Sequence, residues 1–325
     1  MDRSAVPPPV TMVLEAADAW LPARMAAVEK HLHRLGAGHG EVLAADAGAT
    51  LAAGGKRLRP MLVLLSAGPG AGEAAIRAAA AVELVHMATL VHDDVLDAAP
   101  LRRGRPTVVA SSGRERALAT GDLLFSRAFA ELAREGTEEQ VELLSRTSVA
   151  LALGELAQRR EAFDVSISAH HYLKRCELKT ARLFECACLI GRAGSDGEEQ
   201  ALGTFGREIG LGFQLLDDVL DVTGPPERTG KARGTDLLDG TVTLPLILAR
   251  DRDGRLAELD LRGLDAERAE MICDRIAATG VLEQVREGAR ERVERAKRAL
   301  VGSGLDPERR RLLELVADGV VDRYA

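Results

Sequence analysis

The pentapeptide DDVLD occurs twice in the chain, at Asp93–Asp97 and at Asp217–Asp221. On a helix, aspartates four residues apart lie on one face, where like charges repel unless a cation lies between them. A single pentad of this kind is more often a solvated helix face. The second copy, however, ends the apolar segment FGREIGLGFQLLDDVLD, which argues against simple exposure to solvent. Carboxylates on rigid helices suit Mg²⁺, which prefers a few carboxylates plus phosphate oxygens to a site built only of protein groups.

Basic residues that could neutralise a phosphate group occur near these pentads. GGKRLRP places Lys56, Arg57 and Arg59 after two glycines, and LRRGRPT places Arg102 and Arg103 shortly after the first pentad. Arginine forks match diphosphate oxygens bidentately, and glycines allow backbone to approach an anion. Each residue alone would be an ordinary surface charge. Together they favour a phosphate-bearing substrate, with further candidate groups at Lys179, Thr180 and Lys231.

Composition and motifs exclude several other classes of site. The sequence has no EF-hand loop and no HExxH, which removes calcium-sensor and zinc-protease sites. Aromatic residues are only 3%, too few for the stacking platforms of single-stranded nucleic-acid binders. Lys+Arg 43 against Asp+Glu 50 gives a net charge of −7, so no overall field attracts nucleic acid or anionic lipid. Any phosphate chemistry must therefore be local.

The first pentad ends the segment AVELVHMATLVHDDVLD, which is predicted to be a helix with two faces. At helical spacing, an apolar stripe is formed by Leu84, Met87, Ala88, Val91 and Val95. A second, largely polar stripe is formed by Glu83, His86, Leu90, Asp93, Asp94 and Asp97. We expect this helix to bury one face and to present the other to a polar cavity.

The distribution of proline predicts an all-α protein. No proline occurs from Thr107 to Gly224, a stretch rich in Ala, Leu, Glu and Arg, which favours long helices. Strand signals are weak, because β-branched residues seldom alternate with polar ones. With 325 residues, 46% apolar and 29% charged, the chain is globular and long enough for one large domain or two ordinary ones. We expect a large single-domain helical bundle over residues 10–325, preceded by a flexible tail over residues 1–9.

Cysteine usage and apolar runs indicate a cytoplasmic protein. The four cysteines form no CxxC pair, which favours structural thiols in a reducing compartment. The N-terminus MDRSAVPPPV lacks the apolar core of a secretory signal. Apolar runs elsewhere are broken by charge before the ~18 residues that a membrane span requires. We therefore expect a protein that does not span a membrane.

From Gly54 to Pro245 the chain resembles the trans-isoprenyl diphosphate synthases, also called polyprenyl synthetases. The resemblance rests on motifs in consistent order: GGKRLRP, ELVHMATLVHDDVLD, LRRGRPT, GDLLFSRA, GELAQ, LKTARLF, FGREIGLGFQLLDDVLD, GKARGTDLLDG and TLP. It implies a bundle of the isoprenoid synthase type around a deep central cavity, normally a homodimer, with the pentads facing each other across the mouth. It also implies an enzyme of isoprene biosynthesis that condenses isopentenyl diphosphate with an allylic diphosphate, head to tail and trans, and releases diphosphate.

The resemblance also implies roles for individual residues. About three Mg²⁺ would be held against the allylic diphosphate by Asp93, Asp97 and Asp217, with Asp94, Asp218 and Asp221 in support. The same diphosphate would contact Arg102, Lys179 and Lys231, and its approach would be lined by Thr180 and Gln214. Isopentenyl diphosphate would be held by Lys56, Arg59, His86 and Arg103, with Gly55 as a close backbone contact. The residues assigned to catalysis are Asp93, Asp94, Asp97, Arg102, Lys179, Asp217, Asp218 and Lys231.

One motif departs from the family pattern. The family often reads GKxxGxDxxxGKxT after the second pentad, whereas GKARGTDLLDGTVT has Thr241 at the position of the second lysine. We expect one diphosphate cation to be missing, and Arg233 is the candidate to replace it. The change affects closure of this loop more than the reaction.

Small residues before the first pentad predict a long product. Ala88 and Thr89 lie one turn before Asp93, Val85 lies further along, and one turn rises about 5.4 Å, close to one isoprene unit. Short-chain members of the family commonly place an aromatic residue there. We therefore expect a medium-to-long polyprenyl diphosphate in preference to geranylgeranyl or farnesyl diphosphate. The alternative is that Phe125 or Phe129 closes the cavity from another helix.

Three other functions remain as alternatives. A class I terpene cyclase also uses an aspartate-rich helix, but GGKRLRP and the second DDVLD count against it. A squalene-type synthase would lack an isopentenyl diphosphate site. A non-catalytic subunit of a heteromeric synthase typically loses aspartates from one pentad, whereas this chain retains all six.

Overall fold

Long helices fill the proline-free stretch, as the sequence predicts. The computed structural model describes residues 8–38, 40–52, 55, 57–102, 104–192, 196–224 and 233–322. Within the proline-free stretch lie α7 (Arg114–Glu135), α8 (Glu138–Arg160), α10 (Arg182–Ile190) and α11 (Asp196–Thr223). The start of α8 is fixed by a capping box, in which Thr137 and Gln140 each satisfy the other's backbone N–H.

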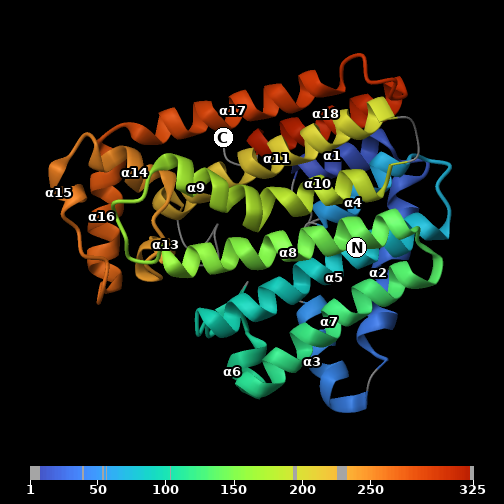
Figure 1. Ribbon diagram of the computed structural model, residues 1–325, viewed down its shortest axis with the longest axis horizontal. Helices are drawn as coiled ribbons and strands as arrows, with labels where there is room; N and C mark the ends of the chain where they lie inside the picture. Colours follow the sequence, from blue (N-terminus) through green and yellow to red (C-terminus); the bar gives the residue numbers. More distant parts are fainter. Residues whose placement is uncertain are drawn as a thin grey trace.

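The predicted helix with two faces is α5 (Glu73–Leu96), and most of its residues are buried. Its apolar stripe is buried from Leu84 to Val95. It packs against α7, against α4 (Leu58–Ala67) and against α2 (Leu21–Gly36). A separate long pair is formed by α11 and α17 (Val281–Leu300), which lie side by side in Figure 1. The all-α prediction is thereby confirmed.

Shorter helices complete the bundle at its edges and ends. The N-terminal part adds α1 (Pro8–Ala16), α3 (Gly40–Ala52) and α6 (Val108–Ser112). The C-terminal half adds α9 (Ala169–Cys176), α13 (Thr235–Leu238), α14 (Leu244–Arg250), α15 (Gly254–Ala257), α16 (Ala266–Ala278) and α18 (Pro307–Asp322). Of the predicted tail, residues 1–7 lie outside the described residues.

A two-stranded hairpin, which was not predicted from the sequence, interrupts the helices. Strands β1 (Leu101–Arg102) and β2 (Arg105–Pro106) are antiparallel, with Leu101 opposite Pro106 and Arg102 opposite Arg105. Gly104 in the turn has φ 73°, a left-handed conformation that favours glycine. Strands of two residues are too short for an alternating pattern to reveal them.

Burial explains the chemistry of the cysteines and of the most apolar helix. All four cysteines are free and buried. Burial raises the pKa of Cys186 to about 12, which keeps its thiol protonated. Among the described helices, α5 alone is long and apolar enough to cross a membrane, and 67% of its most apolar window is buried inside the bundle. This burial is typical of the core helix of a soluble protein.

Candidate active site

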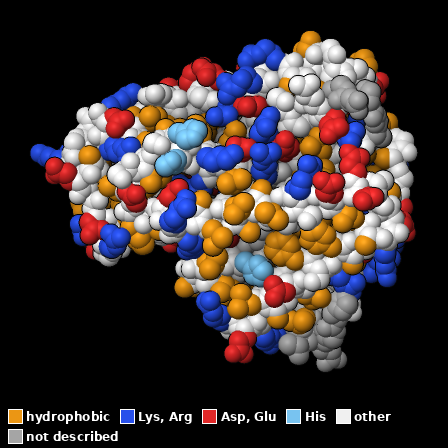
Figure 2. Space-filling model, viewed as in Figure 1, with side chains coloured by type: hydrophobic (Ala, Val, Ile, Leu, Met, Phe, Trp, Pro, Cys, Tyr) orange, Lys and Arg blue, Asp and Glu red, His pale blue; other side chains and the backbone are white. Residues whose placement is uncertain are grey.

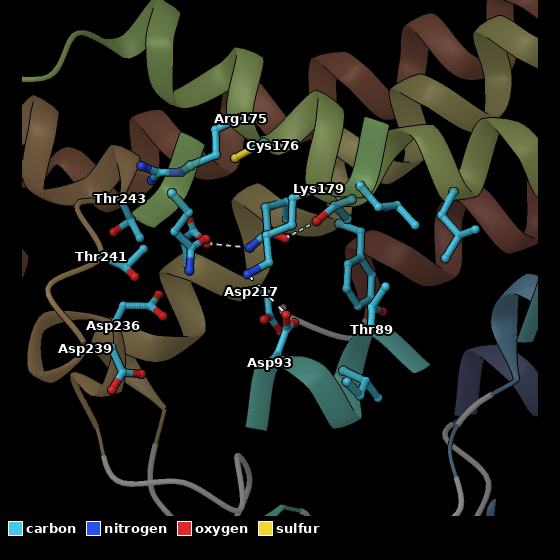
Figure 3. Close-up of a pocket in the computed structure, with 18 of the residues that line it drawn as sticks. Thr89, Asp93, Arg175, Cys176, Lys179, Asp217, Asp236, Asp239, Thr241 and Thr243 are labelled. Atoms are coloured by element: carbon cyan, nitrogen blue, oxygen red, sulfur yellow. Dashed lines mark hydrogen bonds and ion pairs between the residues drawn. The ribbon is translucent and has the colours of Figure 1, made fainter. Parts of the chain in front are cut away.

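A cavity of about 280 Å³ opens between α5, α8, α11 and the segment that joins α9 to α10. Figure 3 shows Asp93 pointing from α5 toward Lys179, with Asp236, Asp239 and Thr241 along the other side. Eleven of the predicted site residues line it: Arg59, His86, Thr89, Asp93, Asp97, Arg102, Lys179, Thr180, Gln214, Asp217 and Asp218. The fold thus brings both pentads and residues of both predicted substrate sites to one cavity.

The first pentad splits between two faces of α5. Asp93 and Asp97 line the central cavity, whereas Asp94 is only 5% exposed and is not part of its lining. Asp94 Oδ1 accepts hydrogen bonds from Arg102 Nε and Nη2, both at 2.7 Å. Asp94 borders a second, largely apolar cavity of about 300 Å³, and Arg102 lines both cavities. Asp94 therefore orients Arg102.

Side chains from α8 and from the α9–α10 connection neutralise the first pentad. Lys179 Nζ lies 3.8 Å from Asp93 Oδ2 and 2.5 Å from Glu155 Oε2. Arg159 Nη2 lies 2.5 Å from Asp97 Oδ1, and its Nε donates to Glu155 Oε1 at 2.8 Å. Burial raises the pKa of Asp93 from 3.8 to about 6, although the charge of Lys179 opposes the shift. The roles of Glu155 and Arg159 were not predicted from the sequence.

Lys179 and Thr180 lie on a π-helical turn, η2 (Glu177–Ala181), between α9 and α10. Such turns are rare and are frequently found at functional sites. The backbone of α8 comes close to this turn at Gly154, where an added Cβ would lie 2.7 Å from the Lys179 nitrogen. Glycine is therefore required here by the close approach of two backbones.

The second pentad differs from the first, because both of its adjacent aspartates line the cavity. Asp217 and Asp218 are both in the lining, but Asp218 is only 2% exposed and each of its carboxylate oxygens accepts a hydrogen bond. The Tyr172 hydroxyl donates to Asp218 Oδ2 at 2.5 Å, and Gln214 Nε2 donates to Oδ1 at 2.8 Å. Thr180 Oγ1 donates to Gln214 Oε1 at 2.7 Å, which links η2 to α11. Burial, followed by the charge of Asp236, raises the pKa of Asp218.

Asp221 ends the pentad away from the cavity. Its carboxylate accepts from the backbone N–H of Asp236 at 3.3 Å, and its carbonyl accepts from the Gly234 N–H at 3.0 Å. These bonds join the last turn of α11 to the start of α13. Thr241, which lies between α13 and α14, lines the cavity. Arg233 does not line it; its guanidinium lies 2.7 Å from Asp274 and donates to the Val222 carbonyl.

Only some of the residues predicted to bind isopentenyl diphosphate line the cavity. Arg59 and His86 line the cavity, and the Arg59 guanidinium lies 4.5 Å from the ring centroid of Phe184. Gly55 is exposed and is not part of the lining. Two of these residues, Lys56 and Arg103, lie outside the described residues, as does Lys231 of the predicted allylic diphosphate site.

The three predicted chain-length residues also differ in position. Thr89 lines the cavity and donates to the His86 carbonyl at 2.8 Å. Ala88 and Val85 are fully buried and do not line the cavity. Of the three, Thr89 is therefore the side chain one turn below Asp93 that a ligand in the cavity would meet.

Several lining residues were not singled out from the sequence. Asp236 and Asp239 lie in GTDLLDG, a motif without a spacing rule that reveals ligands, and Tyr172 and Arg175 follow no pattern at all. Arg175 Nη2 donates to the Val242 carbonyl at 2.6 Å and thereby fixes the segment next to Thr241. Only the folded chain brings these groups together.

The donor set of the cavity fits a divalent cation. Its lining carries the carboxylates of Asp93, Asp97, Asp217, Asp218, Asp236 and Asp239. Over the described residues, no group of three or more His, Cys, Asp or Glu is already arranged to hold a metal ion. Hard carboxylates without a closed protein cage suit a cation that is bound together with phosphate oxygens.

Comparisons with known proteins agree with this geometry. The family model for polyprenyl synthetases matches residues 41–270. Heptaprenyl diphosphate synthase component 2 of Geobacillus stearothermophilus is 39% identical over 265 residues, which cover 80% of this chain and 83% of that protein. Octaprenyl diphosphate synthase of Escherichia coli (strain K12) is 36% identical over 257 residues, or 76% of this chain and 80% of that protein.

Solved structures share the whole fold. A polyprenyl synthase from Caulobacter crescentus CB15, complexed with calcium and isoprenyl diphosphate, superposes with a TM-score of 0.90 at 34% identity, covering 97% of this chain and 98% of that one. A decaprenyl diphosphate synthase from Rhodobacter capsulatus gives 0.86 at 31% identity, covering 97% and 99%. With its fold and most of its length shared, the chain belongs to the polyprenyl synthetase family of chain-elongating prenyltransferases.

Proposed function

We propose that this chain is a Mg²⁺-dependent synthase that condenses isopentenyl diphosphate with an allylic diphosphate, head to tail and in the trans configuration. The observation that carries the proposal is the cavity lined by carboxylates of both pentads together with Arg59, Arg102 and Lys179. Carboxylates and cations in one cavity suit a metal-bound diphosphate. Apolar side chains in the same lining, Leu151, Leu183 and Phe213, suit a prenyl chain.

The roles of the residues follow from where charge develops. About three Mg²⁺, held by Asp93, Asp97 and Asp217, would offset the charge that builds on the departing diphosphate. Asp94, Asp218 and Asp221 would support these three metal ligands by hydrogen bonds to nearby residues: Arg102, Gln214 and the backbone of Asp236, respectively. The cations Arg102, Lys179 and Lys231 would bind the same diphosphate, with Thr180 and Gln214 orienting it. Isopentenyl diphosphate would lie against Lys56, Arg59, His86 and Arg103, near Gly55.

The apolar part of the lining then protects the reacting carbon. Departure of diphosphate leaves an allylic cation, which the double bond of isopentenyl diphosphate attacks before a proton is lost. Side chains such as Leu151, Leu183 and Phe213 exclude water, which would otherwise quench the cation.

We infer that the product is a medium-to-long polyprenyl diphosphate. Two features support this inference. Thr89, which lines the cavity one turn below Asp93 beside Leu90, has a small side chain, and two relatives above are named heptaprenyl and octaprenyl diphosphate synthases. The alternative is a shorter product, since a relative from Methanosarcina mazei, 35% identical over 281 residues, is named geranylgeranyl diphosphate synthase.

Chromatography of the products tests both the reaction and the length. The purified chain is incubated with Mg²⁺, farnesyl diphosphate and labelled isopentenyl diphosphate, and the dephosphorylated products are sized. We expect labelled products longer than geranylgeraniol, and none after removal of metal with EDTA. A product with only one added isoprene unit would contradict the inferred length. If no labelled prenyl product formed in the presence of Mg²⁺, the proposed reaction would be contradicted.

We also propose that the synthase is a cytoplasmic homodimer with one helical domain over residues 10–325. An exposed apolar stripe supports the dimer: Val149, Leu153 and Leu156 on α8 are 58%, 52% and 65% exposed, and Leu118 on α7 is 39% exposed. Figure 2 shows apolar side chains gathered over α8. Side chains at i, i+4 and i+7 form one face of a helix, and a continuous exposed face of this kind marks a contact surface.

One observation favours a second assembly. The Geobacillus relative is named component 2, which points to a synthase made of two different chains. Light scattering and turnover, measured on the purified chain without a partner protein, distinguish the homodimer from the heteromer. A homodimer that elongates unaided, and that dissociates in the Leu153→Glu variant, supports our proposal. A chain that is inactive alone, although folded, supports the heteromer.

A further inference from the structure

Arg57 lies in the middle of GGKRLRP, yet it does not face the cavity. It is 4% exposed and is not part of the lining, although Arg59 two residues later is. Its φ of 47° and ψ of 36° are left-handed, a conformation that residues other than glycine rarely adopt. Arg57 is also the N-cap of α4, and its carbonyl accepts from the Met61 N–H at 3.0 Å. Its conformation therefore sets where α4 begins.

The Arg57 guanidinium binds three separate elements. Its Nε lies 2.5 Å from Glu29 Oε1 on α2, and its Nη1 lies 2.7 Å from Glu83 Oε1 on α5. Its Nη2 donates to the Leu51 carbonyl at the end of α3 at 3.0 Å. The side chains of Arg57 and Glu83 are only 2% and 4% exposed. Removing one partner of such a pair leaves a buried charge uncompensated.

The Arg57–Glu83 ion pair connects the two described side chains of the predicted isopentenyl diphosphate site. Arg59 follows Arg57 on the first turn of α4, and His86 follows Glu83 by one turn on α5. Both Arg59 and His86 line the cavity. We propose that Arg57 and Glu83 are positioning residues, which fix Arg59 and His86 relative to each other so that both reach one diphosphate.

This inference rests on the proposed function, because it assumes that Arg59 and His86 bind isopentenyl diphosphate. It requires the planar fork of arginine, since a lysine ammonium cannot bind two carboxylates and a carbonyl in three fixed directions. Displacement of a substrate-binding group by about 1 Å is enough to cost up to about a hundredfold in rate. The allylic side, around Lys179 and Asp217, shares no contact with Arg57.

The test compares Arg57→Met, Arg57→Lys and Glu83→Gln with a control variant on α18 that contacts the other end of α4. Arg309 donates to the Leu65 and Ser66 carbonyls at the other end of α4, so Arg309→Met disturbs α4 away from the cavity. For each variant, KM is measured for isopentenyl diphosphate and for farnesyl diphosphate, together with the Tm. Calorimetric binding of isopentenyl diphosphate alone gives a second readout.

We expect Arg57→Met to raise KM for isopentenyl diphosphate about tenfold or more, with KM for farnesyl diphosphate changed less than about twofold. Arg57→Lys and Glu83→Gln should also raise KM for isopentenyl diphosphate more than KM for farnesyl diphosphate, but by a smaller factor. These two variants test the proposal if Arg57→Met does not fold. Arg309→Met lowers the Tm and leaves both constants unchanged.

Equal changes in the two constants, or none in any of the three variants, would overturn the positioning role. Failure of the proposed function gives a different result. A wild-type chain that binds isopentenyl diphosphate but never elongates contradicts the proposed function, while calorimetry on the variants still decides the positioning role. A wild-type chain that does not bind isopentenyl diphosphate contradicts both.

Discussion

Adjacent aspartates in the first pentad face different surroundings because an α-helix turns about 100° per residue. Asp93 faces the cavity beside Lys179, whereas Asp94 faces the hairpin and binds Arg102. The pair Asp217 and Asp218 is divided less sharply, since both line the cavity, but Asp218 is buried and accepts hydrogen bonds from Tyr172 and Gln214. In each pentad, the second aspartate is hydrogen-bonded to the protein.

The division predicts different kinetics for neighbouring variants. Asp93→Ala and Asp217→Ala should abolish turnover, because each removes a proposed metal ligand. Asp94→Asn should keep metal binding but raise KM for the allylic diphosphate about tenfold or more, since losing charged hydrogen bonds to Arg102 costs about 1.5–3 kcal/mol. Steady-state constants and metal titration measure both effects. If Asp94→Asn lost metal affinity as Asp93→Ala does, Asp94 would be a ligand and our assignment would be wrong.

Spacing predicted the chemistry of these residues but not their partners. That Asp93, Asp97 and Asp217 share a cavity with Arg59 and Lys179 was expected from the motifs. The burial of Asp94 and Asp218 was not, because the helix that covers each face is set by tertiary packing. Arg57 shows the same limit: in the sequence it is equivalent to Arg59, and only the contacts with Glu29 and Glu83 separate them.

At the scale of elements, the π turn η2 depends on its close approach to α8. Gly154→Ala should force the two backbones apart, at a cost of about 1–3 kcal/mol in the free energy of unfolding. Because Lys179 lies at the contact, kcat/KM for the allylic substrate should fall about tenfold or more. Urea unfolding and steady-state kinetics measure the two effects.

A matched control is available on α17. Gly288 is also helical, but no atom lies within 4 Å of an added Cβ. Gly288→Ala should therefore leave activity unchanged and stabilise the protein by up to about 1 kcal/mol. If Gly154→Ala behaved like Gly288→Ala, the close approach at η2 would have no functional importance.

A second contact between elements links α2, α5 and α7 away from the cavity. Glu131 is 2% exposed, and its Oε2 lies 2.6 Å from His31 Nε2 and 2.8 Å from Arg77 Nη1. Burial alone would raise the pKa of Glu131, but the hydrogen bonds and charges of His31 and Arg77 prevail and lower it from 4.5. The folded protein therefore binds this proton more weakly than the unfolded chain does.

The sign of this shift predicts how stability depends on pH. The contribution of Glu131 is present above the ordinary glutamate pKa and is lost as the pH falls through the lowered one. Glu131→Gln should cost about 3 kcal/mol at pH 7. Its difference from the wild type should shrink as the pH falls below about 4.5. Urea unfolding from pH 7 down to about pH 3 measures this, with Glu135→Gln, at the more exposed end of the same cluster, as a small-effect control.

Helices and their buried faces could be predicted where the sequence pattern extended over many residues. The proline-free stretch predicted α7, α8 and α11, and apolar spacing predicted the buried face of α5. The hairpin at Leu101–Pro106 and the π turn were not predictable, since both are short and are fixed by contacts distant in sequence. Hydropathy alone also cannot separate α5, which is mostly buried in the bundle, from a membrane span.

At the scale of the whole molecule, the shape of the cavity limits the chain length of the product. Thr89 faces the cavity, whereas Ala88 and Val85 are buried in the core. Thr89→Phe should therefore shorten the product, because an aromatic ring would block the path of the growing chain. Ala88→Phe should mainly lower the Tm, because it overpacks the core. Product chromatography and thermal unfolding decide between them; a product unchanged in Thr89→Phe would place the floor on another helix, near Phe125 or Phe129.

The central claim is that two substrates react in one cavity, and diphosphate release tests it most directly. Release from farnesyl diphosphate with Mg²⁺ is measured with and without isopentenyl diphosphate, in the wild type and in Asp217→Ala. We predict release only when both substrates are present, one diphosphate for each isopentenyl unit incorporated, and none from the variant. Equal release without isopentenyl diphosphate would indicate a cyclase or a hydrolase, and no release with both substrates would indicate a non-catalytic subunit; either result would contradict the account.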